Sequence, residues 1–157
     1  MQTIVGNILD VDRGIIVHQV DDQGRFYSPL ASDLNDRYPR VRENYLRWIT
    51  SPNIVENPLG LVQLTQITPT LGVASLVAQC GYGRFERTGI VYTQYAAFQN
   101  ACTQLMRELF IPDGIPFYFP EHIGCGHAGG NWPRIAAIID AVFEGRAIIV
   151  RPEEETK

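Results

Sequence analysis

The apolar residues of the chain follow two kinds of spacing, which predict two kinds of secondary structure. Continuous apolar runs, rich in β-branched and aromatic residues, predict buried strands. They lie at residues 15–19, 61–68, 72–79, 116–119 and 147–150. Apolar residues three or four positions apart predict amphipathic helices over 29–49 and 92–110, and an apolar stretch over 135–143 predicts another helix. Strands separated by helices predict a three-layer α/β sandwich.

Single residues set the expected boundaries of these helices. Pro39 should divide the first helical region into two short helices, because proline lacks a backbone N–H and clashes with the preceding turn. Thr88 or Gly89 is expected at the start of the long central helix. Asn131 is expected to cap the last helix, with Pro133 in its first turn.

Length and composition are those of one ordinary globular domain. The chain has 157 residues, of which 45% are hydrophobic and 19% are charged. A domain of this size buries most of the surface that its unfolded chain exposes. We therefore expect a single domain over residues 1–151, followed by a short tail over residues 152–157.

The sequence indicates neither a membrane nor an oxidising compartment. No apolar run approaches the ~20 residues that cross a bilayer, and the first residues lack the basic and apolar regions of a secretory signal. Cys80, Cys102 and Cys125 are an odd number of cysteines without a C-x-x-C pair, which argues against a disulfide framework and a zinc site. We expect a cytoplasmic protein with reduced thiols, no metal and no cofactor.

The charge of the chain limits its expected partners. A net charge of −4 and a pI near 5.3 provide no basic footprint for duplex nucleic acid. The expected partner is a small or locally recognised ligand. Open α/β sheets bind such ligands in a crevice at the carboxyl ends of their strands.

A glycine-dense loop lies between a predicted strand and a predicted helix. Four of the seven residues from 124 to 130 are glycines. Glycines allow backbone N–H groups to approach an anion closely, and the start of the following helix favours negative charge. The loop is therefore a candidate phosphate cradle, and a purely structural glycine turn is an equal alternative.

Several segments together resemble the macro domain family, in their order and in their spacing. They are residues 6–10, 16–24, 37–39, 59–60 and 123–132, and the resemblance extends from Gly6 to about Val150. The branch that it resembles contains the ADP-ribose 1″-phosphate phosphatases and the ADP-ribosyl-glutamate hydrolases. The resemblance implies a three-layer α/β/α sandwich with a mixed central sheet. It also implies ADP-ribose or a derivative as ligand, and it allows an ADP-ribosylated protein as partner.

The resemblance implies roles for two groups of residues. Asn7, followed by Ile8, stands where the family recognises the adenine amino group, and its side-chain oxygen can accept that hydrogen bond; capping a turn is the alternative role for Asn7. Other positions match the two loops that enclose the diphosphate and the distal ribose: Ser28, Leu30 and Ala31 in the first, and Gly124, Cys125, Gly126, His127, Ala128 and Gly129 in the second. A Cβ at Gly126 or Gly129 would then occupy the space of the diphosphate.

The first loop and its flanking strand depart from the family pattern. Tyr27 and Pro29 stand where glycines are usual, and proline removes one expected N–H donor to phosphate. Asp21, with Asp22 beside it, replaces a family asparagine at the distal ribose. Carboxylates there would repel a diphosphate, yet Asp21 could act as a general base. A solvated acidic turn is the alternative interpretation.

The candidate catalytic residues are Asp21, His127 and Asn131, and they form an incomplete set. Asn131 stands where the phosphatase-like branch has an aspartate, and Lys157 is the only lysine, although the hydrolase branch uses one after the central strand. His127 titrates in a useful range, but its ring could instead simply cover the ligand. His18, in an apolar strand, is expected to be a core histidine. An enzyme, a binding module and a subunit that has lost its ligand all remain open.

Overall fold

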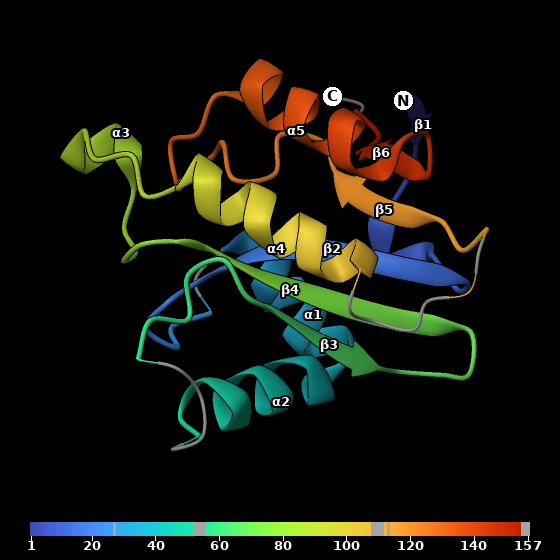
Figure 1. The fold of residues 1–157 in the computed structure, drawn as a ribbon, viewed down its shortest axis with the longest axis horizontal. Helices are drawn as coiled ribbons and strands as arrows, with labels where there is room; N and C mark the ends of the chain where they lie inside the picture. The colour runs from blue at the N-terminus through green and yellow to red at the C-terminus, as the bar shows by residue number, and fades with distance from the viewer. Residues whose placement is uncertain (27, 52–55, 108–111, 113, 155–157) are drawn as a thin grey trace.

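The computed structural model describes residues 1–26, 28–51, 56–107, 112 and 114–154, which form a mixed six-stranded sheet covered by helices on both faces (Figure 1). The strands lie in the order β1-β6-β5-β2-β4-β3, and every neighbouring pair is parallel except β3 and β4. Their bounds are β1 Gln2–Val5, β2 Gly14–Asp21, β3 Val62–Gln66, β4 Leu71–Gln79, β5 Phe117–Pro120 and β6 Ala147–Arg151. The predicted three-layer α/β/α sandwich with a mixed central sheet is confirmed.

The helices divide into two layers because successive strand residues face opposite sides of the sheet. Ile16 and Val20 of β2 pack in the cluster that contains α1 (Pro29–Arg37) and α2 (Pro39–Ile49). Ile15 and Val17 pack in the other cluster, with the helices α4 (Tyr95–Arg107) and α5 (Trp132–Phe143). The central strand β2 is buried along its whole length, which explains the apolar run at Ile15, Ile16 and Val17.

Several helix boundaries lie where single residues of the sequence predict them. Pro39 begins α2 directly after α1 ends, so the predicted division into two helices is confirmed. Asn131 is the N-cap of α5, where its Oδ1 accepts a hydrogen bond of 3.1 Å from the backbone N–H of Arg134. Pro133 lies in the first turn of that helix, as predicted.

The prediction that Thr88 or Gly89 begins the long helix is wrong. A short helix, α3 (Phe85–Thr88), ends at this point, and Gly89 closes it in the left-handed conformation with φ 69°. Glycine adopts that conformation without the penalty that a Cβ imposes, so it stops a helix rather than starting one. The helix α4 begins only at Tyr95, and the predicted end at 108–110 lies outside the described residues.

Two further elements were not predicted, and both lie at the amino end of the chain. The strand β1 is exposed at all four residues and therefore shows no buried apolar pattern. A single 3-10 turn, η1 (Ile8–Asp10), follows it. Within the described part of the chain, no helix combines the length and the apolar character needed to cross a membrane.

Candidate functional site

A groove runs along the edge of the sheet at which the parallel strands end. It consists of two adjoining clefts, which share Leu30, Pro120 and Glu121 in their walls. The inner cleft has a volume of about 290 Å³ and lies over the end of β2 and beside the glycine-dense loop of residues 124–130. The outer cleft has a volume of about 670 Å³ and lies beside η1. This is the position at which open α/β sheets bind ligands.

Asn7 and Ile8 line the outer cleft, together with the carboxylates of Asp10 and Asp33. The Oδ1 atom of Asn7 accepts a hydrogen bond of 3.0 Å from the backbone N–H of Leu9, so the residue caps η1. A carboxamide oxygen has two lone pairs and can accept a second hydrogen bond. Asn7 can therefore cap the turn and present an acceptor to the cleft at the same time.

The glycine-dense loop of residues 124–130, called the late glycine loop below, forms one wall of the inner cleft. Its lining residues are Gly124, Gly126, His127 and Ala128. Within the described chain, the backbone N–H groups of Gly124, Gly126 and Ala128 donate to no protein acceptor. The loop is closed by a hydrogen bond of 2.8 Å from the N–H of Gly130 to the carbonyl of Gly124. Unpaired N–H groups in a fixed loop are suited to bind an anion.

The sequence predicts the same role beside the diphosphate for Gly126 and Gly129, but the two glycines lie in different surroundings. No described heavy atom lies within 4 Å of the position that a Cβ on Gly126 would take. A Cβ on Gly129 would lie 2.7 Å from the ring of Phe85, and Gly129 has φ 74°. Gly129 is therefore required for the packing of α3 against the loop, and it is not among the residues that line either cleft.

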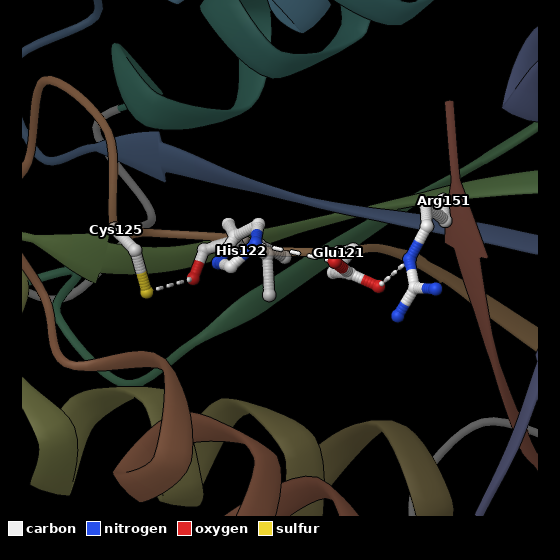
Figure 2. Close-up of polar contacts among 5 residues, drawn as sticks. Glu121, His122, Cys125 and Arg151 are labelled. Carbon is white, nitrogen blue, oxygen red and sulfur yellow. Dashed lines mark hydrogen bonds and ion pairs between the residues drawn. The ribbon is translucent and has the colours of Figure 1, made fainter. Parts of the chain in front are cut away.

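Cys125 also belongs to the loop but does not line the clefts. Its Sγ donates to the carbonyl of Ile123 at 3.3 Å (Figure 2), and burial raises the pKa of the thiol to about 11. All three cysteines are free thiols, and Cys102 is buried. Among the residues that the structure describes, no three His, Cys, Asp or Glu side chains are grouped to hold a metal ion.

The first loop enters the inner cleft through Ser28, Pro29 and Leu30. Ser28 is the N-cap of α1, and its Oγ accepts a hydrogen bond of 3.0 Å from the backbone N–H of Ala31. Ala31 itself is buried and lies outside the lining of either cleft. Tyr27, which stands where the family usually has a glycine in this loop, lies outside the described residues.

Asp21 is turned away from the clefts and organises the backbone of the residues that follow it. The residue is 1% exposed. The carboxylate accepts three backbone hydrogen bonds, from Gln23 at 2.8 Å, Arg25 at 3.1 Å and Phe26 at 2.9 Å. The hydroxyl of Tyr45 donates to the Asp21 carbonyl at 2.5 Å. These contacts favour a structural role for this carboxylate over the role of general base.

Among the three catalytic candidates, only His127 lines the inner cleft. Its Nδ1 lies 3.3 Å from Oε1 of Glu86 on α3. The pKa of Glu86 is lowered, first by its own backbone N–H and also by His127. Asn131 caps α5, and its N–H donates to the hydroxyl of Tyr95 at 2.9 Å. The structure thus does not bring Asp21, His127 and Asn131 together in one site.

An ionic cluster lies between the two clefts, and the sequence did not predict it. Glu121 lines both clefts, and its Oε2 accepts from Nε of Arg151 at 2.8 Å (Figure 2). Its Oε1 lies 3.2 Å from Nε2 of His122, which is at the entrance of the glycine loop. Only the parallel pairing of β5 with β6 brings Glu121 and Arg151 together, so local sequence patterns give no signal for it.

The floor of the inner cleft is formed by the polar side chains of His18 and Gln19. His18 is a buried core histidine, as predicted, and its Nε2 forms a hydrogen bond of 2.7 Å with the hydroxyl of Ser75. Burial lowers the pKa of His18 to about 3. The sequence did not indicate that the end of β2 also provides the cleft floor.

His18 predicts a loss of stability in acid. In an unfolded chain the pKa of histidine is about 6.5, whereas burial keeps the folded form neutral down to about 3. Its contribution is therefore complete above about pH 6.5 and decreases as the pH falls towards 3, by up to about 1.4 kcal/mol per pH unit. Urea unfolding between pH 7 and pH 4.5 measures this slope. His18→Gln should have a shallower slope, and an unchanged slope would exclude His18 as its source.

No family model matches the sequence, and no curated protein sequence matches it. A protein from Bacteroides thetaiotaomicron is 23% identical with a TM-score of 0.78, and the match covers 97% of each chain. The macrodomain protein of Streptomyces coelicolor is 21% identical with a TM-score of 0.73, over 98% of this chain and 99% of its own.

A third structure was solved with a ligand. DarTG of Thermosipho africanus, in complex with ADP-ribose, is 12% identical with a TM-score of 0.71, over 99% of this chain and 43% of its own. The mixed sheet, its two helix layers and these matches over nearly the whole chain lead to one conclusion. The chain has the macrodomain fold.

Proposed function

We propose that the chain recognises ADP-ribose, or a derivative of it, in the groove at the carboxyl edge of the sheet. The observation that carries this proposal is the row of unpaired N–H groups at Gly124, Gly126 and Ala128 in the wall of the inner cleft. A diphosphate has only acceptor oxygens and matches such donors. The complex of Thermosipho africanus DarTG with ADP-ribose supports the same ligand for this fold.

The two clefts suggest the direction in which the nucleotide lies. The outer cleft presents the Asn7 oxygen, an acceptor that matches the adenine amino group. The inner cleft, beside His127, then receives the distal ribose. An ADP-ribosylated protein, in which that ribose carries the attached group, is a further ligand that this proposal allows. Calorimetric titration with ADP-ribose tests the proposal, and GMP and inorganic phosphate serve as non-binding controls.

Asn7 provides the first prediction for binding. Asn7 is exposed in the free protein, and Asn7→Ala should weaken ADP-ribose binding by about 0.5–1.5 kcal/mol, because an acceptor for the adenine amino group is lost. Asn7→Asp retains an oxygen that can cap η1 and face the cleft, so it serves as the matched control and should bind more tightly than the alanine variant. Equal affinity of Asn7→Ala and the unmodified protein, measured by calorimetry, would remove Asn7 from the site.

Binding without turnover is the form of the function that the site supports best. The Asp21 carboxylate is held by three backbone donors, and Asn131 caps a helix outside the lining of the clefts. We therefore propose a module that reads or sequesters an ADP-ribose-derived signal. The placement of His127 in the inner cleft supports the second candidate, a phosphatase or ADP-ribosyl hydrolase acting at the distal ribose.

Turnover of ADP-ribose 1″-phosphate separates the two candidates. We expect phosphate release to be slow or absent, because a positioned general base contributes about 10²–10⁴-fold and Asp21 and Asn131 are both engaged in structural contacts. Phosphate release is measured over time with excess enzyme. If release is rapid and His127→Gln abolishes it, the protein is an enzyme and the binding-module proposal is wrong.

A further inference from the structure

The carboxamide of Gln19 is held in one orientation at the floor of the inner cleft. Gln19 is 7% exposed, and it lines the cleft from the end of β2. Its Nε2 donates to Oγ1 of Thr93 at 3.0 Å and to Oε1 of Gln79 at 3.3 Å. Both N–H groups of the side chain are therefore used within the protein.

Thr93 determines which end of the carboxamide faces it. The Thr93 hydroxyl donates its one hydrogen to the carbonyl of Gly124 at 2.6 Å, so it can only accept from Gln19. The atom of Gln19 that faces Thr93 must be the nitrogen. The oxygen, Oε1, is consequently directed elsewhere, and it is buried without a hydrogen-bond partner among the described residues.

Gln19 Oε1 lies directly beneath the late glycine loop. It is 2.8 Å from the position that a Cβ on Gly124 would take, and Gly124 lines the same cleft. A second buried polar atom without a described partner, Nδ1 of His18, belongs to the neighbouring residue of the cleft floor. Buried polar groups are paired in folded proteins as a rule, so a buried acceptor without a described partner, on a residue that lines the cleft, indicates a place for a ligand donor.

We infer that Gln19 Oε1 determines specificity by accepting a hydrogen bond from a hydroxyl group of the ligand's distal ribose. This inference rests on the proposed function and adds the sugar-reading group to it. The donor must come from the sugar, since a diphosphate has none and the adenine amino group is assigned to Asn7 in the outer cleft. Gln79 and Thr93 are positioning residues, because they act by fixing the orientation of Gln19.

The test compares two nucleotides and two variants by calorimetry. ADP lacks the distal ribose that ADP-ribose carries. Gln19→Met should weaken ADP-ribose binding by about 10- to 100-fold and leave ADP binding within about twofold, because one hydrogen bond to the sugar is lost. Gln99→Met, on the exposed surface of α4, is the matched control and should change neither affinity. Thermal unfolding checks that both variants are folded.

A second measurement needs no variant and so does not depend on folding. Three ADP-ribose analogues are compared, each lacking one hydroxyl of the distal ribose, at 1″, 2″ or 3″, and the unmodified protein should bind the one that lacks the donor about 10- to 100-fold more weakly than ADP-ribose. For that analogue, Gln19→Met should cause no further loss. A purely structural role of Gln19 would instead weaken all ligands together, including ADP.

The outcomes separate this inference from the function on which it rests. Unmodified protein that binds neither ADP nor ADP-ribose would overturn the proposed function and the inference with it. Protein that binds ADP-ribose tightly, but loses equal affinity for both nucleotides in Gln19→Met, would overturn only the role of Gln19. Full affinity for all three analogues, lacking the 1″-, the 2″- or the 3″-hydroxyl, would overturn the role of Gln19 as a reader of the sugar.

Discussion

Replacing Gly126 with valine should abolish ADP-ribose binding and leave the protein folded. The Cβ of the new side chain has no described heavy atom within 4 Å, and Gly126 lines the inner cleft, so the side chain takes part of the space proposed for the diphosphate. Loss of several N–H contacts of about 1 kcal/mol each weakens binding by about 100-fold or more. Calorimetry measures the affinity, and urea unfolding measures the stability. Native affinity in this variant would show that the late loop is not the phosphate site.

Gly129→Val is the informative contrast, although both glycines lie in the same loop. Its side chain collides with the Phe85 ring at a backbone φ of 74°, so we expect a loss of stability and the release of α3 from the loop. Binding should fall as well, but as a consequence of the damaged fold. A stable Gly129→Val variant would contradict the packing described between Phe85 and this loop.

Replacing Asp21 with alanine should lower the free energy of unfolding by about 5 kcal/mol. The three backbone N–H groups of Gln23, Arg25 and Phe26 lose a charged acceptor, and each such hydrogen bond contributes about 1.5–3 kcal/mol. Alanine offers these partly buried donors no replacement. Urea unfolding measures the change directly, and a loss below about 1 kcal/mol would show that the carboxylate does not hold this segment.

Asp21→Asn tests the same contacts more finely. A carboxamide has one acceptor oxygen, so its NH₂ group must face at least one of the three N–H donors, at a cost of about 2 kcal/mol. Asp22→Asn is the matched control. The Asp22 carboxylate accepts a backbone hydrogen bond of 2.9 Å from the N–H of Gly81 and a side-chain hydrogen bond from Cys80, and an amide oxygen can keep the backbone bond. If the two asparagine variants are equally stable, the special role of Asp21 is disproved.

The arrangement of layers could be predicted because burial leaves a direct pattern in the sequence. Residues 15–17 are all apolar since β2 is covered on both faces by helices. Pro39 and Asn131 act through their own backbone chemistry, so their effects could be located without knowledge of the fold. The exposed strand β1 has no such signal, and it is recognised only through its pairing with β6.

The candidate site could be predicted less completely, because a side chain's type does not determine its direction. A carboxylate after a strand suits a general base or a loop anchor equally well, and only the three short contacts of Asp21 distinguish them. Gln19 depends on partners 60 and 74 residues away along the chain. No local pattern records such contacts, so this residue could not be assigned to the site from the sequence.

The main-chain donors in the wall of the inner cleft make the candidate site tolerant of changes in the sequence. The unpaired N–H groups at Gly124, Gly126 and Ala128 exist whatever side chains surround them. Amino-acid substitution is restricted mainly at two positions. Gly124 must adopt φ 75°, and Gly129 must leave room for a neighbouring side chain. A surface built in this way can persist while the side chains around it change.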